Sequence, residues 1–256
     1  MVAIDTHKTH NISWVDLAAK DVDESIKWYS GLFGWDTFND GETDYHIFMM
    51  GESPVGGVMQ MRPGMEDMPQ VWSTYVTVED ADATVAEVKE AGGAVFQEPF
   101  EIPGGGRIAV IADPSGAALC LFEGNEENGL KLMDENGAPC WFDCATRDTE
   151  AVGAFYGEVF GWTSEFMEEM NYTVFSNEGE WVCGMFALPD EVPAEVPSHW
   201  VVDFVVPDAD AAAEYATSHG GTVTMPPMDT PFGRACGLMD PWGGVLTVID
   251  RSTATQ

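Results

Sequence analysis

Two kinds of charged side chain recur at matching places in the two halves of the chain, and together they could carry out acid–base chemistry. Asp16 and Asp143 each follow Trp-Xaa, whereas Arg107 and Arg234 each follow Gly and precede a β-forming run. The chain has only five arginines, so a repeated arginine indicates a specific task. A buried aspartate can act as a general base, and an arginine can anchor a carboxylate or enolate. These four residues are therefore candidate catalytic residues, and a structural ion pair that closes the site is the alternative.

The recurring residues belong to an internal repeat with an offset of 127 residues, from Trp14 to Trp141. Three stretches carry it: "WVDLAAKD" (14–21) and "WFDCATRD" (141–148), "WYSGLFGW" (28–35) and "FYGEVFGW" (155–162), and "DPSGAALCLFE" (113–123) and "DPWGGVLTVID" (240–250). Tyr45 and Gly57 recur as Tyr172 and Gly184. A repeat of this length is a domain. We expect similar domains at 1–124 and 138–256, joined by a polar linker at 125–137.

Within each half, the order of the elements also appears twice. The stretch "ISWVDLAA" alternates like a strand, and Asp21 then begins a helix, with Glu24 completing a capping box and Gly34 ending it. A second strand, "VWSTYVTVE", precedes a second helix that ends at Gly92-Gly93, and three strand-like runs follow each helix. The sequence therefore predicts an α+β fold of four βαβββ modules, two in each domain.

The composition limits the partners. The net charge is −34, from 44 acidic and 10 basic residues, which repels nucleic acids and anionic lipid surfaces. We interpret this charge as a solvated surface adapted to high salt, and the alternative is a docking site for a cationic partner. The N-terminus lacks the layout of a secretion signal, no apolar run approaches the ~20 residues of a membrane helix, and the odd number of cysteines argues against a disulfide framework. We expect a soluble cytoplasmic protein, either a monomer or a homodimer.

The motifs "WVDLAAKDVDESIKWYSGLFGW", "VTVEDADATVAEVKEAGG" and "DPSGAALCLFE", each repeated in the second half, resemble the vicinal oxygen chelate superfamily. That superfamily contains glyoxalase I, bleomycin-resistance proteins and extradiol dioxygenases, and the chain is most similar to its tandem-domain, glyoxalase-like subgroup. The resemblance implies curled mixed sheets that form a cup around a small ligand. Whether each cup forms within one half or across both halves stays open at this point.

The resemblance also implies one divalent metal ion in the cup, held by His, Glu or Gln from four strands. The corresponding positions in this chain hold other residue types: Trp14 and Trp141, Cys120 and Thr247, approximately Ser73 and Val201, and approximately Met59 and Phe186. Tryptophan and methionine do not bind a hard divalent ion. His46 and His199 lie near expected cup strands, but neither has a companion ligand. We expect no metal site and no cofactor.

Strand alternation from Trp14 and Cys120 places Asp16 and Phe122 on the cup side. We expect the following ligand-binding residues: Trp14, Phe48, Met59, Trp72, Cys120 and Phe122 in the first domain, and Trp141, Phe175, Met185, Trp200 and Thr247 in the second. Aromatic and methionine walls suit flat, apolar or cationic ligands. The alternative is that these residues fill the cups as a second core.

Three functions remain possible. The first is a bleomycin-resistance-like protein that binds a small, partly aromatic or amphipathic molecule without a metal. The second is a glyoxalase-like lyase, an isomerase or a dioxygenase-type enzyme that uses an unrecognised metal site or an Asp/Arg pair. The third is a structural remnant with filled cups. The missing metal ligands favour the first.

Overall fold

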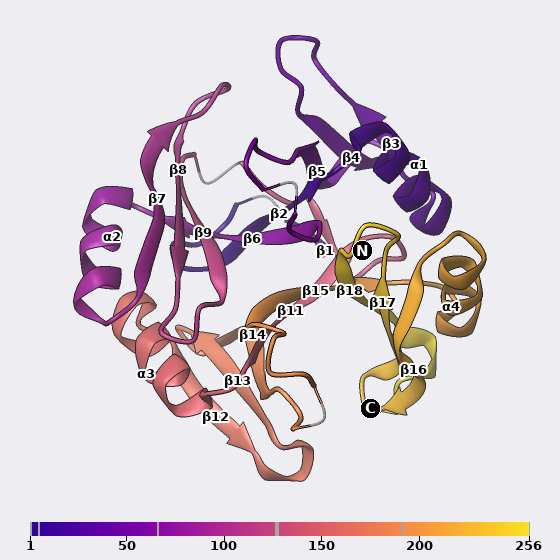
Figure 1. Ribbon diagram of the computed structural model, residues 1–256. Helices are drawn as coiled ribbons and strands as arrows, with labels where there is room; N and C mark the ends of the chain where they lie inside the picture. The colour runs from indigo at the N-terminus through magenta and orange to yellow at the C-terminus, as the bar shows by residue number, and fades with distance from the viewer. Residues whose placement is uncertain (1, 5, 66, 126–127, 191, 256) are drawn as a thin grey trace.

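The protein consists mainly of two eight-stranded sheets, one built from each half of the chain (Figure 1). The structure is a computed structural model that describes residues 2–4, 6–65, 67–125, 128–190 and 192–255. Each sheet curls, and the two sheets lie back to back with their concave faces pointing in opposite directions. The cups therefore form within each half and not across the two halves.

The first half contains two successive βαβββ modules. Their elements are β2 (Ile12–Ala19), α1 (Val22–Phe33), β3 (Asp36–Phe38), β4 (His46–Met50) and β5 (Ser53–Gln60), then β6 (Val71–Val78), α2 (Ala81–Glu90), β7 (Ala94–Glu101), β8 (Arg107–Ala112) and β9 (Ala118–Glu123). Strands follow the order β3-β4-β5-β2-β6-β9-β8-β7. The β2–β5 and β6–β9 pairs are parallel, and the remaining pairs are antiparallel, so the sheet is mixed as predicted.

The second half repeats this arrangement. Its elements are β11 (Pro139–Thr146), α3 (Thr149–Phe160), β12 (Thr163–Met167), β13 (Tyr172–Asn177) and β14 (Glu180–Ala187), then β15 (His199–Val205), α4 (Ala209–Ser218), β16 (Thr222–Thr230), β17 (Gly233–Met239) and β18 (Val245–Asp250). The strand order is β12-β13-β14-β11-β15-β18-β17-β16. The predicted α+β class and the four βαβββ modules are confirmed.

The helices begin and end where their capping residues indicate. The Asp21 carboxylate accepts a hydrogen bond from the Glu24 backbone amide, and Gly34 ends α1 in the left-handed region at φ 75°. One detail differs from the prediction, because the Glu24 side chain accepts a bond from Lys27 rather than closing a capping box. In α3, Asp148 and Gly161 take the same two places, so the repeated sequence specifies the same helix ends twice.

The repeated aromatic motif joins the two halves. The Tyr29 hydroxyl donates to Asp240 Oδ2 at 2.7 Å, and the Tyr156 hydroxyl donates to Asp113 Oδ2 at 3.0 Å. Each tyrosine therefore bonds the Asp-Pro turn of the opposite half. All four side chains are buried, and a hydrogen bond to an ionised group contributes about 1.5 to 3 kcal/mol. The motif is thus an element of the interface between the halves.

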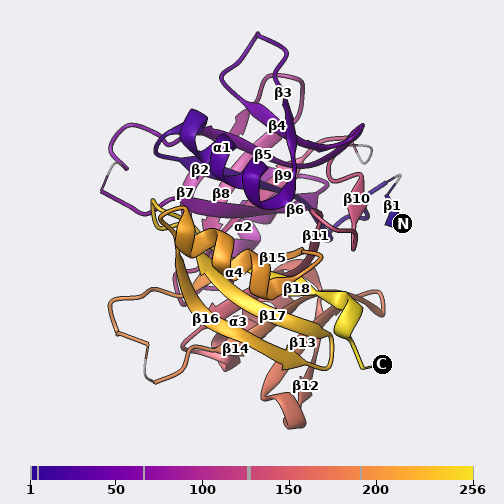
Figure 2. The same ribbon diagram turned by 90° about the vertical axis from the view of Figure 1, so that its right-hand side faces the viewer.

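The convex faces of the two sheets share one aromatic core at this interface. Phe204 on β15 packs against Phe33, Trp35 and Trp72 of the first half, with ring centroids 5.0, 5.5 and 5.2 Å apart. Figure 2 shows α4 lying beside the first half, where the Tyr215 hydroxyl donates to the Trp28 carbonyl. A single core therefore holds the two sheets together.

The segment between the two halves is less open than its polar composition indicates. β10 (Leu132–Met133) pairs with β1 (Val2–Ala3) in a separate two-stranded sheet, and Leu130 is fully buried. Two short 3₁₀ turns, Glu168–Met170 and Arg251–Thr253, complete the described elements. None of the helices in the described ranges combines the length and apolar character needed to span a bilayer.

Candidate functional site

The concave face of the first sheet, which we call the N-terminal cup, carries Trp14, Asp16, Tyr45, Tyr75 and Cys120. Strand register brings them together: Trp14 on β2 lies opposite Tyr75 on β6, and Tyr75 lies beside Cys120 on β9. Asp16 follows Trp14 by two residues and therefore projects from the same face of the sheet. The predicted placement of Trp14, Asp16 and Cys120 in one cup agrees with this arrangement.

A chain of hydrogen bonds links these side chains. Trp14 Nε1 donates to the Tyr45 hydroxyl at 2.7 Å, and the hydroxyls of Tyr45 and Tyr75 donate to Asp16 Oδ2 at 3.3 and 2.8 Å. Gly57 leaves room for this chain, because a Cβ atom there would collide with the Tyr45 hydroxyl. The other carboxylate oxygen, Asp16 Oδ1, is buried and has no hydrogen-bond partner.

Burial governs the acidity of the N-terminal cup. Loss of hydration raises the pKa of Asp16 to about 6, although the bonds from Tyr75 and Tyr45 pull it down. Burial likewise raises the pKa of the Cys120 thiol to about 12, so this thiol is protonated and unreactive at neutral pH. Asp16 is therefore the one group among these that titrates near neutrality.

The concave face of the second sheet, the C-terminal cup, carries Trp141, Asp143, Tyr172, Asp203 and Thr247. Trp141 Nε1 donates to the Tyr172 hydroxyl at 2.6 Å, and that hydroxyl donates to Asp143 Oδ1. The Trp–Tyr–Asp chain of the first cup is thus repeated, and Gly184 again leaves room for the tyrosine.

Asp203 distinguishes the second cup. It lies opposite Trp141 and beside Thr247, which is the place that Tyr75 occupies in the first cup. Burial raises the pKa of Asp203 well above its usual range, and the nearby charge of Asp143 raises it further. Burial also raises the pKa of Asp143 to about 6. Two neighbouring carboxyls of this kind favour holding a proton between them.

The two cups differ in how exposed to solvent the side chains on their floors are. Asp16, Tyr75 and Cys120 expose 2%, 4% and 6% of their surface. Asp143 and Asp203 are only partly buried, as is Thr247. The floor of the N-terminal cup is therefore closed by its own side chains, whereas the floor of the C-terminal cup keeps contact with solvent.

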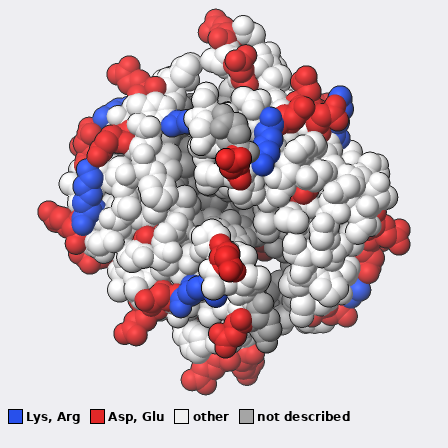
Figure 3. Space-filling view, viewed as in Figure 1, with Lys and Arg blue, Asp and Glu red and all other residues white. Residues whose placement is uncertain are grey.

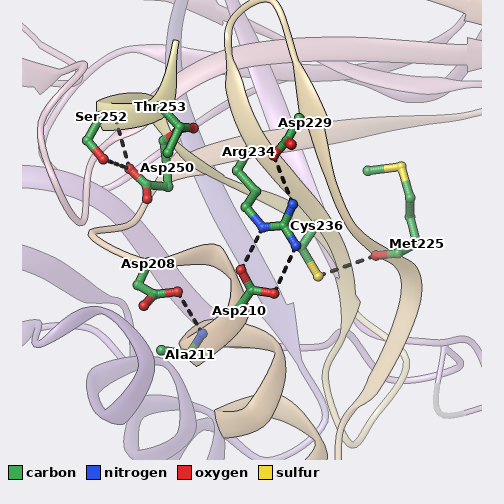
Figure 4. A network of polar contacts seen from close by, with 10 residues as sticks. All are labelled: Asp208, Asp210, Ala211, Met225, Asp229, Arg234, Cys236, Asp250, Ser252 and Thr253. Atoms are coloured by element: carbon green, nitrogen blue, oxygen red, sulfur yellow. Dashed lines mark hydrogen bonds and ion pairs between the residues drawn. The ribbon is translucent and has the colours of Figure 1, made fainter.

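The two repeated arginines lie away from these aspartates. Arg234 binds Asp210 at the start of α4, with Nε to Oδ2 at 2.6 Å, and binds Asp229 at 2.8 Å (Figure 4). Arg107 binds Asp82 at the start of α2, at 2.8 Å, and Glu123 at 3.2 Å. The expected Asp/Arg catalytic pair does not form, because Arg107 and Arg234 point to the helices. Their ion pairs are structural, but they join helix to sheet and do not close the cups.

Six of the expected ligand-binding residues lie on the concave faces: Trp14, Met59, Cys120, Phe122, Trp141 and Thr247. Met59 lies two residues from Gly57, which faces Tyr45, and Phe122 lies two residues from Cys120, so each shares the cup-facing side of its strand. The phenyl ring of Phe122 lies over the backbone of Gly106 and Gly124, at the far end of β9.

The other five expected residues face the shared core: Phe48, Trp72, Phe175, Met185 and Trp200. Trp72 Nε1 donates to the Tyr29 hydroxyl, and Trp200 Nε1 donates to the Tyr156 hydroxyl. The expectation that they line the cups is wrong. Phe48 lies opposite Gly56 and Phe175 lies opposite Cys183, each one residue from a cup-facing glycine, and Trp72 lies one residue from the cup-facing Ser73, so strand alternation turns them towards the core. Phe186, and not Met185, shares its face with Gly184.

The side chains at the superfamily's ligand positions determine whether the cups could coordinate the divalent ion that the superfamily implies. In the described parts of the chain, no three or more His, Cys, Asp or Glu side chains converge in a way that could hold a metal. The Trp14 indole already donates to Tyr45, and an indole N–H has no lone pair to offer. The residues at the superfamily's ligand positions therefore do not fit a hard divalent ion.

Sequence reasoning missed four residues of the cup floors. Tyr45 and Tyr172 were visible as repeat partners, and their pairing with Gly57 and Gly184 could have indicated a close side-chain contact. Tyr75 and Asp203 gave no such signal, because they differ in type between the halves. Only the strand register shows that they occupy one position.

Comparison with known proteins supports this fold. Residues 11–121 and 141–248 each match the Glyoxalase/Bleomycin resistance protein/Dioxygenase superfamily. "Putative glyoxylase CFP32" of Mycobacterium tuberculosis is 37% identical over 246 residues, covering 93% of both chains. "Anthracycline biosynthesis protein DauV" of Streptomyces sp. strain C5 is 32% identical over 255 residues, covering 93% of this chain and 92% of that protein.

Among solved structures, the Mn(II)-bound glyoxalase from Novosphingobium aromaticivorans superposes with a TM-score of 0.62 at 16% identity, over 97% of this chain and 86% of that chain. The 2,3-dioxygenase LapB from Pseudomonas sp. KL28 gives 0.63 at 13% identity, over 95% and 93%. These two similarities concern the fold alone. With a family match in each half and relatives above 30% identity along nearly the whole length, the chain belongs to the glyoxalase/bleomycin resistance protein/dioxygenase superfamily.

Proposed function

We propose that the protein binds a small, flat, partly aromatic or amphipathic molecule in its cups, without a resident divalent metal ion. The observation that carries this proposal is the Trp–Tyr–Asp chain, which stands at matching places in both cups. The C-terminal cup is the better candidate for the ligand, because its floor is the more open of the two.

The chemistry of the chain suits such a ligand. Trp14 and Trp141 are partly exposed, and each is fixed in place by its indole hydrogen bond. A fixed indole offers a planar face for stacking, while the carboxyl beyond it can orient a hydroxyl or carbonyl group. The names of the Streptomyces relatives add support, because anthracyclines are flat polycyclic molecules.

The absence of fitting metal donors supports binding over metal-dependent chemistry. A divalent ion would need oxygen or imidazole ligands where this chain has Trp14, Trp141, Cys120 and Thr247. Asp16 is bonded by two tyrosines and Asp143 has only Asp203 as a neighbouring carboxyl, so among the described residues neither belongs to a set of three or more hard ligands.

The test is a fluorescence titration with acridine, a flat heteroaromatic compound, in buffer containing EDTA. We expect acridine to quench tryptophan emission, and Trp141→Ala to weaken binding roughly tenfold because a stacking face is lost. Trp14→Ala shows how much of the acridine binding is due to the N-terminal cup. Phe96→Ala, which removes an exposed ring on β7, is the matched control. If acridine and related planar compounds do not bind, the proposal fails and the remnant hypothesis replaces it.

An acid–base enzyme is a second candidate, favoured by one observation. Asp16 and Asp143 both have a pKa near 6, which suits a general base working close to neutral pH. Such an enzyme would be a lyase or isomerase acting through an aspartate without an arginine partner. Solvent deuterium incorporation into a bound carbonyl compound would reveal it, and Asp143→Asn would abolish incorporation while preserving acridine binding.

A further inference from the structure

This inference rests on the proposed function and names the ligand class of one cup. We propose that the C-terminal cup takes a planar organic cation, with its positive charge beside Asp143 and Asp203 and its ring system against Trp141 and Trp181. Four observations support this assignment: an unpaired carboxylate oxygen, the lack of a neutralising cation, an aromatic wall, and the contrast with the other cup.

The carboxylates of the C-terminal cup are incompletely satisfied. Asp203 Oδ1 is buried without a hydrogen-bond partner, and Thr247 lies beside Asp203 on the neighbouring strand. Asp143 receives its bond from Tyr172. A buried carboxyl oxygen left unpaired costs free energy, so a ligand that supplies a positive charge or an N–H donor would recover part of that cost.

No basic side chain of the described ranges forms an ion pair with either aspartate. Arg251 attracts the Asp203 carboxylate from a distance, but its guanidinium binds Asp134 at 2.7 Å. The other second-half arginine with ion pairs, Arg234, is held by Asp210 and Asp229. Two carboxyls without a close counterion produce a negative potential that a small cation can enter.

An aromatic pair forms a wall of the same cup. The rings of Trp141 and Trp181 meet edge to face, with centroids 6.4 Å apart and an interplanar angle of 68°. Trp181 on β14 is 56% exposed, which is unusual for so large an apolar side chain. Tryptophan is the side chain that attracts a cation most strongly through its ring face. The wall therefore suits both the flat body and the charge of an organic cation.

The N-terminal cup lacks these features. Tyr75 replaces Asp203, so the cup holds a single carboxyl. The repeat places Pro54 where the second half has Trp181. Arg62, which lies 5.2 Å over the Phe100 ring, adds positive potential near Asp16. A cationic ligand is therefore specific to the C-terminal cup.

The experiment compares two probes with the same planar body, N-methylacridinium, which always carries a positive charge, and acridine, which is uncharged in weakly alkaline buffer. Acidic side chains are scattered over the face drawn in Figure 3 and outnumber the basic ones, so the surface would attract any cation. The titrations are therefore done in about 1 M salt, where the screening length falls to about 3 Å and surface attraction is suppressed. Attraction inside the cup is screened much less.

We expect N-methylacridinium to bind at least tenfold more tightly than acridine. Asp203→Asn should reduce that preference roughly tenfold and leave acridine binding almost unchanged. Asp36→Asn, which removes an equal charge from exposed β3, should change neither value. Trp181→Ala, at an exposed site that folding does not require, should weaken both probes.

The outcomes separate the two proposals. If both probes bind equally and Asp203→Asn changes nothing, the cation assignment is overturned while the proposed function stands. If neither probe binds, both proposals fail. Melting curves of each variant establish that it is folded, and Asp203→Asn should melt no lower than the wild type because it removes an unfavourable buried charge.

Discussion

The two cups share a Trp–Tyr–Asp chain, and the difference that most changes their charge is at one strand position, which holds Tyr75 in the first and Asp203 in the second. Tyr75 donates to Asp16 and closes the floor of its cup. Asp203 instead adds a second carboxyl to the C-terminal cup, and the floor of that cup keeps contact with solvent. The comparison teaches that a duplicated scaffold can keep the same hydrogen-bonded chain in both cups while substitution at one strand position adds a second carboxyl to one of them.

The surrounding fold explains why this position can vary. The interface between the halves uses the convex faces of the sheets, where Tyr29 and Tyr156 bond Asp240 and Asp113. The cups lie on the opposite faces. A change at residue 75 or 203 therefore leaves the shared core intact.

Installing the second cup's carboxyl in the first cup should have the largest effect. Tyr75→Asp places two carboxyls side by side in a closed floor, removes a large buried ring and supplies no counterion. We expect a loss of about 3 to 5 kcal/mol in the free energy of unfolding at neutral pH, partly restored in acid. Urea unfolding measures this loss, and the control variant Tyr75→Phe should lose only about 1 kcal/mol. Equal stability of the two variants would show that the positions are not comparable.

The pH dependence of stability comes next in size. The pKa of Asp16 is about 6 in the folded protein against 3.8 for an aspartate in the unfolded chain, so between these values the folded state holds a proton that the unfolded chain has released. Stability from this residue is therefore present in acid and is lost as the pH rises from about 4 to 6, by about 3 kcal/mol. Asp16→Asn should remove this loss, as measured by urea unfolding across that pH range. If the unfolding free energy of the variant fell with pH as steeply as that of the wild type, the account would be contradicted.

The two tyrosines of the repeated chain should differ. Tyr172→Phe leaves Asp143 without the hydroxyl that bonds it, whereas Tyr45→Phe leaves Asp16 the bond from Tyr75. We expect losses of about 2 kcal/mol for Tyr172→Phe and about 1 kcal/mol for Tyr45→Phe. Thermal unfolding of both variants tests this order, and the reverse order would argue against Tyr75 as the supporting donor.

The smallest effect is a gain. Asp203→Asn relieves the repulsion between two neighbouring carboxyls, so the free energy of unfolding should rise by about 1 kcal/mol at neutral pH, the equivalent of one pKa unit. In acid, where both carboxyls are protonated, the variant and the wild type should be equally stable. Denaturation at two pH values checks this, and a destabilised variant at neutral pH would show that Asp203 has a structural partner.

The fold could be predicted because the sequence features that specify it involve neighbouring residues and occur in both halves of the chain. The capping residues Asp21 and Gly34 and their repeats at Asp148 and Gly161 mark the helices, and strand alternation marks the sheets. The inward placement of Asp16 and Asp143 followed from the same alternation. These features depend on a few neighbouring residues, which a single sequence contains.

The rest of the site depends on contacts between distant strands. Phe48 and Phe175 were misplaced because the face of their strands is set by pairing with Gly56 and Cys183 on a neighbouring strand. Asp82 and Asp210, the helix partners of Arg107 and Arg234, lie about 25 residues earlier in the chain, and no short-range pattern joins them to the arginines. Tyr75 and Asp203 were missed because a repeat draws attention to identical residues and hides the positions that differ.

The central claim is that the cups bind small molecules without a metal ion, and metal loading tests it most directly. Tag-free protein would be dialysed against Mn²⁺, Fe²⁺, Ni²⁺ and Zn²⁺ in turn, in high salt to suppress binding to the acidic surface, and then analysed for bound metal. We predict far less than one ion per chain, with no difference between the wild type and Asp143→Asn. One or two ions per chain, lost in Asp16→Asn or Asp143→Asn, would contradict the account.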